Sequence, residues 1–201
     1  GVFRVTDGLQ EKHGSRRVFD SPLAEGGLAA IAFGMGLNGL RPIVEIQFSD
    51  YIFPAYDHIV SELAKYRYRS GGHFSAPVVI RTPFGGGIRG GLYHSQSPES
   101  LFAHIAGLKV VIPSNPYDAK GLLLSATEDD DPSTFMGPKR VYRAARGEVP
   151  EDYFTVPIGR AAVSREGTDV TVVCYGAMVH TALEAAEVAE NRNVSLEVVD
   201  L

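Results

Sequence analysis

Short apolar stretches alternate with longer segments of helical periodicity along most of this chain. The apolar stretches predict strands at residues 17–20, 42–48, 77–82, 108–113 and 133–136. Helices are expected between them at residues 23–37, 52–69, 99–106 and 116–129. The segment 52–69 is the clearest helix, because its apolar residues recur on one face at 3.6-residue spacing. This order predicts an α/β fold in which a parallel sheet is covered by helices on both faces.

The alternation stops after residue 136 and resumes near residue 158. The charged, proline-containing stretch 137–157 is interpreted as an interdomain linker. Strands are expected beyond it at 158–163, 169–174 and 196–201, with a helix at 178–190. We therefore expect one domain at residues 1–150, followed at 151–201 by a linker and the start of a second α/β domain. Because the chain ends on a strand that follows a helix, this second domain is expected to be truncated.

Composition and charge exclude several classes of protein. The 201 residues are 44% hydrophobic and 21% charged, with a net charge of −5. No stripe of Lys and Arg stands out, so no nucleic-acid partner is expected. No apolar stretch approaches the roughly 20 residues that span a bilayer, so no membrane association is expected. The single cysteine, Cys174, is interpreted as a buried structural thiol, which fits a reducing compartment.

Polar and aromatic residues follow three of the predicted strands. Ligands of open parallel sheets bind beyond the carboxyl ends of the strands. Glu25 follows the first predicted strand, Gln47 and Tyr51 the second, and His94 the third. We expect these segments to converge on one crevice that offers a carboxylate, an amide, an aromatic ring and an imidazole.

Each of these residues also has an ordinary structural interpretation. Glu25 lies in the first turn of a helix, where a carboxylate complements the helix dipole. Tyr51 begins an amphipathic helix and could serve packing alone. Gln47 could line one face of a strand, and His94 could be a surface residue in a loop rich in Gly and Ser.

The glycine loop at residues 85–91 contains the pattern G-x-G-x-x-G after a strand. A dinucleotide site also requires a helix directly after the loop and an acidic partner. Neither is found here, so a tightly turning loop is the preferred interpretation. The neighbouring Ser95 lacks the G-x-S-x-G elbow of a hydrolase nucleophile.

Several long runs together carry a family resemblance. They are Asp20-Ser-Pro-Leu-Ala-Glu-Gly26, Glu45-Ile-Gln-Phe-Ser-Asp-Tyr-Ile-Phe-Pro-Ala55, Lys65-Tyr-Arg-Tyr-Arg-Ser-Gly71, Gly91-Leu-Tyr-His-Ser-Gln-Ser-Pro-Glu99, Gly107-Leu-Lys-Val-Val-Ile-Pro113 and Asp118-Ala-Lys-Gly-Leu-Leu-Leu124. Over nearly the whole chain, the sequence resembles the β subunit of the 2-oxo acid dehydrogenases, in particular the branched-chain type. The resemblance implies a transketolase-type pyrimidine-binding domain lacking its N-terminal part, then a truncated transketolase-type C-terminal domain.

The resemblance also implies roles for individual residues. Glu25 matches the carboxylate that contacts the aminopyrimidine of thiamine diphosphate and shares a proton with its ring nitrogen. Tyr51 matches the aromatic residue that packs on that ring, and Leu23 and Gln47 match its neighbours. His94 matches the active-site imidazole that stabilises intermediates or assists acyl transfer. The cofactor itself stores electrons after carbon dioxide has left.

Metals and partners follow from the same resemblance. The family's diphosphate and Mg²⁺ signature is missing here and belongs to the α subunit, which implies an α₂β₂ heterotetramer with thiamine diphosphate between the subunits. A lipoyl acyltransferase core and a 2-oxo acid substrate are the other implied partners. The resemblance also implies a location in the cytoplasm of a bacterium or in the mitochondrial matrix of a eukaryote. A structural K⁺, held largely by backbone oxygens, is implied at Ala76, Val78, Val79, Ala126, Asp129 and Asp131.

Three alternatives remain open at this point. The chain could be a pyruvate dehydrogenase β subunit or, more distantly, a transketolase-like enzyme. It could also be a non-catalytic assembly subunit, because a shared fold does not imply a shared function.

Overall fold

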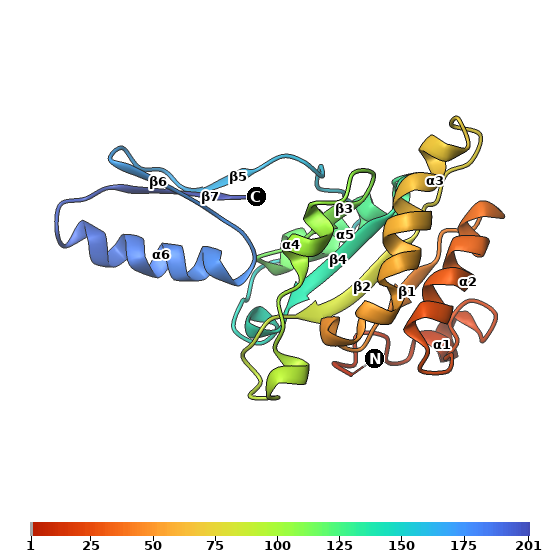
Figure 1. Cartoon of the computed structure of the whole chain (residues 1–201). Coiled ribbons are helices and arrows are strands. Elements are labelled where there is room, and N and C mark those ends of the chain that lie inside the picture. Colours follow the sequence, from red (N-terminus) through yellow and green to blue (C-terminus); the bar gives the residue numbers. More distant parts are fainter. Residues whose placement is uncertain (1) are drawn as a thin grey trace.

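A computed structural model describes residues 2–201 and shows two α/β units joined by an irregular segment (Figure 1). The strands of the first unit are β1 (Ile43–Glu45), β2 (Val79–Phe84), β3 (Lys109–Val111) and β4 (Ser133–Pro138). Its helices are α1 (Leu9–His13), α2 (Glu25–Leu37), α3 (Ala64–Arg69), α4 (Glu99–Ala103) and α5 (Pro116–Glu128). The second unit contains β5 (Ala162–Arg165), β6 (Val170–Cys174), α6 (Ala177–Glu190) and β7 (Leu196–Asp200).

The first sheet is parallel throughout, with the strand order β1-β2-β4-β3. β2 and β4 are buried along their whole length, as expected for parallel strands covered on both sides. Alternate residues of β2 point to opposite faces. Ile80 therefore packs with α2 and α4, whereas Val79 packs with α5. The α/β class predicted from the sequence is confirmed.

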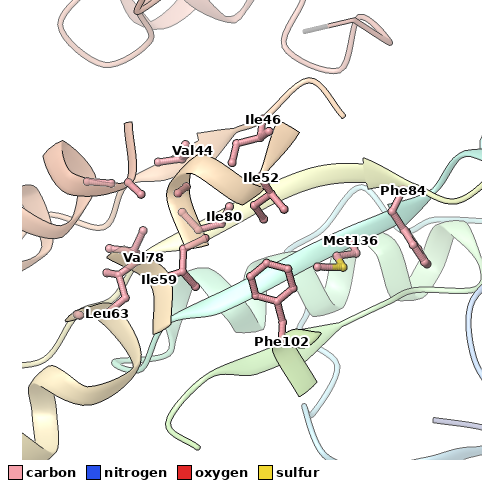
Figure 2. Close-up of a cluster of buried hydrophobic side chains, with 14 residues drawn as sticks. Val44, Ile46, Ile52, Ile59, Leu63, Val78, Ile80, Phe84, Phe102 and Met136 are labelled. Carbon is pink, nitrogen blue, oxygen red and sulfur yellow. The ribbon is translucent and has the colours of Figure 1, made fainter. Parts of the chain in front are cut away.

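The main core lies on the face of the sheet that α2 and α4 cover (Figure 2). Phe102 of α4 is fully buried there beside Met136 of β4, with Ile52, Ile59 and Leu63 contributed by the segment before α3. Burying a side chain of this size stabilises the fold by roughly 1.5–3 kcal/mol. The apolar face predicted for residues 52–69 thus packs into the core.

Three predicted elements differ from the observed ones. Residues 17–20 form no strand: the side-chain amide of Gln10 donates to the carbonyl oxygen of Val18 at 2.9 Å, and Phe19 is exposed. The predicted helix 52–69 is broken into 3₁₀, π and α segments, beginning with the 3₁₀ turn η2 (Phe53–Ala55), in which Pro54 lacks an N–H. The predicted strand 158–163 begins only at Ala162, because the chain turns at Gly159 with a φ of 84°.

The second sheet has the order β5-β7-β6, and β5 runs antiparallel to β7. α6 covers one face, where Cys174, Val179 and Val198 are buried together. Cys174 is a free, buried thiol, as the sequence predicted.

Polar contacts join the two units at the end of β3. Ser114 donates its hydroxyl hydrogen to the Asp200 carboxylate, and its carbonyl oxygen lies 2.8 Å from Nε2 of His180. A small cleft of about 100 Å³ lies beside these contacts and is lined by Asp118, Arg160 and Asp200, among others. Asp200 is thereby buried at the boundary between the units.

Candidate active site

Tyr51 and His94 meet at the carboxyl edge of the first sheet. Tyr51 closes the 3₁₀ turn η1 (Ser49–Tyr51), which follows β1, and His94 closes the 3₁₀ turn η4 (Leu92–His94), which follows β2 and the glycine loop. The Tyr51 hydroxyl oxygen lies 3.1 Å from Nε2 of His94. The structure therefore brings together two of the residues that the sequence placed in one crevice.

The His94 ring is held on several sides. Its Nδ1 lies 3.1 Å from the carbonyl oxygen of Gly90. Because a carbonyl oxygen only accepts hydrogen bonds, Nδ1 carries the hydrogen, and Nε2 of the neutral ring accepts from the Tyr51 hydroxyl. Phe48 packs edge-to-face on His94, with ring centroids 4.4 Å apart, and on Tyr51, at 6.0 Å. His94 is consequently half-buried and oriented, not a free surface residue.

Asp50 fixes the backbone that follows His94. One of its carboxylate oxygens accepts hydrogen bonds from the N–H groups of Ser95 and Gln96, at 3.2 and 3.1 Å. The Ser49 hydroxyl donates to the carbonyl oxygen of Gln96 at 3.3 Å, and the N–H of Gly85 donates to the same oxygen at 2.8 Å. The segment from Gly85 to Gln96, which contains the glycine loop, is thus tied end to end and to η1.

Glu25 is the first residue of α2 and is half-buried. The next residue, Gly26, lies so close to η2 that an added Cβ atom would be 2.9 Å from the carbonyl oxygen of Pro54. The start of α2 is therefore fixed against the turn that follows Tyr51. Leu23, just before it, is 76% exposed, and Gln47, just after β1, is half-buried.

A carboxylate, an amide, an aromatic ring and an imidazole can hold a flat heterocycle that both donates and accepts hydrogen bonds. A diphosphate with a divalent cation needs a cluster of oxygen ligands. No cluster of three or more His, Cys, Asp or Glu side chains suited to a metal occurs within residues 2–201.

The six residues proposed for K⁺ belong to two segments that lie side by side. Ala76 and Val78 lead into β2, which Val79 begins, and the others lie in the last turn of α5 or between α5 and β4. The N–H of Ser133 donates to the carbonyl oxygen of Val78 at 3.0 Å, which joins the two segments. This adjacency suits shared backbone ligation, and the cation itself stays a prediction.

The carboxylates in this region are already paired. Lys109 forms an ion pair with Asp129, and Arg67 lies 2.7 Å from Asp131. Partial burial raises the pKa of Asp129, but hydrogen bonds from Lys109 and from the N–H of Asp131 outweigh this effect and hold the pKa below its ordinary value. A cation bound here would therefore rely on backbone oxygens.

Two charged groups at the carboxyl edge were not assigned from the sequence. Arg81 of β2 is buried and forms an ion pair with Glu45 at 3.2 Å, and its guanidinium donates to the Tyr142 hydroxyl at 3.4 Å. Beside Arg81 and Tyr142 lies a hollow of about 510 Å³. Lys139, directly after β4, is only 5% exposed. The only signal in the sequence was that Lys139 follows a predicted strand, where ligand-binding residues gather. A single lysine at such a position is too common to indicate a site.

The domains identify the class of protein. Residues 1–145 match the family described as the transketolase pyrimidine-binding domain, and residues 159–201 match the transketolase C-terminal domain. The solved structure of a split-gene transketolase, an inactive β4 tetramer, superposes with a TM-score of 0.77 at 25% identity. It covers 99% of this chain, which covers 61% of that one. The chain therefore has a transketolase-type fold.

Curated relatives narrow the class further. The chain is 54% identical to the 2-oxoisovalerate dehydrogenase subunit beta of Bacillus subtilis and 52% identical to the pyruvate dehydrogenase E1 component subunit beta of the same organism. Each match covers all of this chain and 62% of the relative. The 2-oxoisovalerate dehydrogenase subunit beta of Pseudomonas aeruginosa is 48% identical, with 61% of its length covered. The chain belongs to the transketolase pyrimidine-binding domain family, and the relatives it is similar to over its whole length are β subunits of 2-oxo acid dehydrogenases.

This family is thiamine-diphosphate dependent. The chain spans less than two thirds of the length of the relatives named above. No helix within residues 2–201 has the length and apolar character needed to cross a membrane.

Proposed function

We propose that this chain is the β subunit of a 2-oxo acid dehydrogenase that acts on branched-chain 2-oxo acids. The reaction is oxidative decarboxylation followed by transfer of the acyl group to the lipoyl group of an acyltransferase core. The hydrogen-bonded pair of Tyr51 and His94, next to the start of α2 that carries Glu25, is the observation that carries the proposal. Thiamine diphosphate would stabilise the negative charge that develops when carbon dioxide leaves.

Each residue would have a defined task. Glu25 would hold a proton at the ring nitrogen of the aminopyrimidine, and Tyr51, Leu23 and Gln47 would orient that ring. His94 would accept a proton from the reacting substrate at Nε2, directly or through the Tyr51 hydroxyl, with its tautomer fixed by the carbonyl oxygen of Gly90. Phe48 would keep water from one side of the imidazole.

The partner would supply what this chain lacks. An α subunit would bind the diphosphate and Mg²⁺, so that the complete site forms between α and β in an α₂β₂ assembly. The split-gene transketolase with the similar fold is described as inactive in its β4 form, which agrees with an active site that needs a second chain.

The relatives support two substrates almost equally. The chain is 54% identical to the 2-oxoisovalerate dehydrogenase β subunit of Bacillus subtilis and 52% identical to the pyruvate dehydrogenase β subunit of the same organism. A pyruvate dehydrogenase β subunit is therefore the second candidate. In both cases the site at Glu25, Tyr51 and His94 would perform the same chemistry.

The test is reduction of an artificial electron acceptor that depends on a 2-oxo acid. The full-length β protein would be co-expressed with its α partner and assayed with thiamine diphosphate and Mg²⁺. A higher kcat/KM for 3-methyl-2-oxobutanoate than for pyruvate is expected. The reverse preference would replace the proposed substrate with pyruvate and leave the proposed enzyme class unchanged. No turnover of either acid by a well-formed complex would favour a non-catalytic assembly subunit.

A further inference from the structure

A buried lysine lies beside the candidate site without a hydrogen-bonding partner. Lys139 directly follows β4 and is 5% exposed. Its Nζ atom makes no hydrogen bond with any of the described residues and lies 5.3 Å from the centroid of the Phe48 ring. The same ring packs edge-to-face on His94. Phe48 therefore contacts the ammonium group and the imidazole together.

Asp50 is the anion whose charge acts on this cation. Its Oδ1 holds the N–H groups of Ser95 and Gln96, whereas its buried Oδ2 has no hydrogen-bond donor in the described part of the chain. Burial lowers the pKa of Lys139, and the Asp50 carboxylate partly opposes that shift. A cation and an anion are thus buried together beside the segment that positions His94.

The glycine loop also reaches the turn that contains Lys139. Gly87 has a φ of 108°, and a Cβ atom added there would lie 3.2 Å from the Cα atom of Arg140. The residue after Lys139 is therefore in close contact with the loop that leads to His94. The turn that carries Lys139 therefore borders the His94 loop through Arg140 as well as through Phe48.

Stability alone gives no reason for a lysine at this position. An ammonium group removed from water without a hydrogen-bonding partner costs folding free energy. An apolar side chain of similar length would fill the same space without that cost, but it would leave the buried Asp50 carboxylate without a nearby cation. The charge is therefore better explained by its effect on Asp50 and on the Phe48 ring, whose face attracts cations.

We propose that Lys139 is a positioning residue for His94, acting through Phe48 and through the Asp50 carboxylate that anchors the backbone of residues 95 and 96. The cation complements the negative charge of the carboxylate that accepts both N–H groups. It also holds the Phe48 ring against the imidazole. This inference rests on the proposed function for its effect on turnover, but its structural part can be tested without activity.

The kinetic test compares Lys139→Met with Lys139→Arg in the assembled α and β protein, each in the His94 and the His94→Ala background. Misplacing a catalytic group by about 1 Å can reduce the rate roughly 100-fold. We expect Lys139→Met to lower kcat roughly 10- to 100-fold, with little change in KM, and Lys139→Arg to recover much of the loss. In the His94→Ala background Lys139→Met should have no further effect, because residues that act as a unit are not additive. An equal loss in both backgrounds, or no loss, overturns the proposal.

The second test measures amide hydrogen exchange in the peptide that contains Ser95 and Gln96. Lys139→Met should accelerate this exchange roughly tenfold, as expected when a charge-assisted hydrogen bond is weakened. Asp50→Asn should have the same effect, and Lys12→Met, which removes an exposed lysine, should have none. The melting temperature of Lys139→Met should stay close to that of the wild type, because removal of an unpartnered buried ammonium group offsets the loss of the cation near Asp50.

The two tests separate the two hypotheses. If the wild-type complex turns over no 2-oxo acid, the proposed function fails, and the exchange measurement still decides whether Lys139 orders the His94 loop. Exchange at residues 95 and 96 that is the same in the wild type and in Lys139→Met overturns the positioning role. A lower melting temperature with uniformly faster exchange also overturns it, because Lys139 would then be a general structural residue.

Discussion

The hydroxyl group of Tyr51 donates a hydrogen bond to Nε2 of His94 over 3.1 Å, and the carbonyl oxygen of Gly90 lies at the same distance from Nδ1. Both ring nitrogens are thereby engaged, and for an uncharged imidazole these two contacts select a single tautomer. His94 can act as a base at Nε2 only when the Tyr51 hydroxyl moves aside or relays the proton. The two residues therefore form one functional unit.

Tyr51→Phe tests this unit, because it keeps the aromatic ring and removes only the hydroxyl group. A typical hydrogen bond contributes about 0.5–1.5 kcal/mol. We expect kcat to change by roughly threefold to tenfold while the affinity for thiamine diphosphate stays the same. Tyr51→Ala, which also removes the ring, should weaken cofactor binding as well. Wild-type kinetics for Tyr51→Phe would mean that the hydroxyl group has no role in turnover.

Glu25→Gln should abolish decarboxylation and leave assembly intact. The amide keeps the size of the side chain but cannot share a proton with a ring nitrogen as a carboxylic acid does. General acid–base groups contribute roughly 100- to 10,000-fold to rates, so a loss in that range is expected in the electron-acceptor assay. Glu184→Gln on the exposed side of α6 is the matched control. Turnover like that of the wild type would refute the role assigned to Glu25.

The β protein without its α partner should bind thiamine diphosphate weakly. The groups proposed to hold the heterocycle lie in this chain, whereas the diphosphate and Mg²⁺ are proposed to be bound by the α subunit. Isothermal titration calorimetry with Mg²⁺ should therefore detect tight binding only after the α subunit has been added. Tight binding to β alone would contradict the division of the site between two chains.

Asp200→Asn should stabilise the protein at neutral pH. Burial raises the pKa of Asp200, and the charge of Asp118 adds to this, while the Ser114 hydroxyl and His180 act in the opposite direction. Because the folded-state pKa lies above the unfolded one, the stabilising contribution of Asp200 is fully present below the unfolded pKa of 3.8 and is lost as the pH rises through the folded pKa.

Urea unfolding at several pH values measures this effect. The free energy of unfolding of Asp200→Asn should exceed that of the wild type at pH 7 by on the order of 1 kcal/mol. The difference should vanish well below pH 3.8, where the carboxyl group is protonated in both states. Asp152→Asn, at an exposed position in the linker, should change nothing. A difference that does not vary with pH would show that charging Asp200 does not weaken the domain boundary.

The order of elements was predictable because helical and strand periodicities are local properties of the sequence. The buried strands β2 and β4 and the helix α5 lie close to their predicted ranges. The strand predicted at residues 17–20 does not form. Its only apolar residues are Val18 and Phe19, and the side-chain amide of Gln10 donates a hydrogen bond to the Val18 carbonyl oxygen. Such a contact depends on how α1 folds back, which no local pattern encodes.

The sequence by itself determined the α/β class, the segments that reach the carboxyl edge of the sheet and the family to which the chain belongs, because periodicity and motif are written in adjacent residues. Only the tertiary structure decided which groups meet there. The Tyr51 to His94 hydrogen bond, the Asp50 anchor and the buried Lys139 join residues 43 or more positions apart or on separate strands. Which of these residues come into contact depends on the register of β1, β2 and β4 and on the packing of the loops that follow them. It does not depend on neighbouring residues in the sequence.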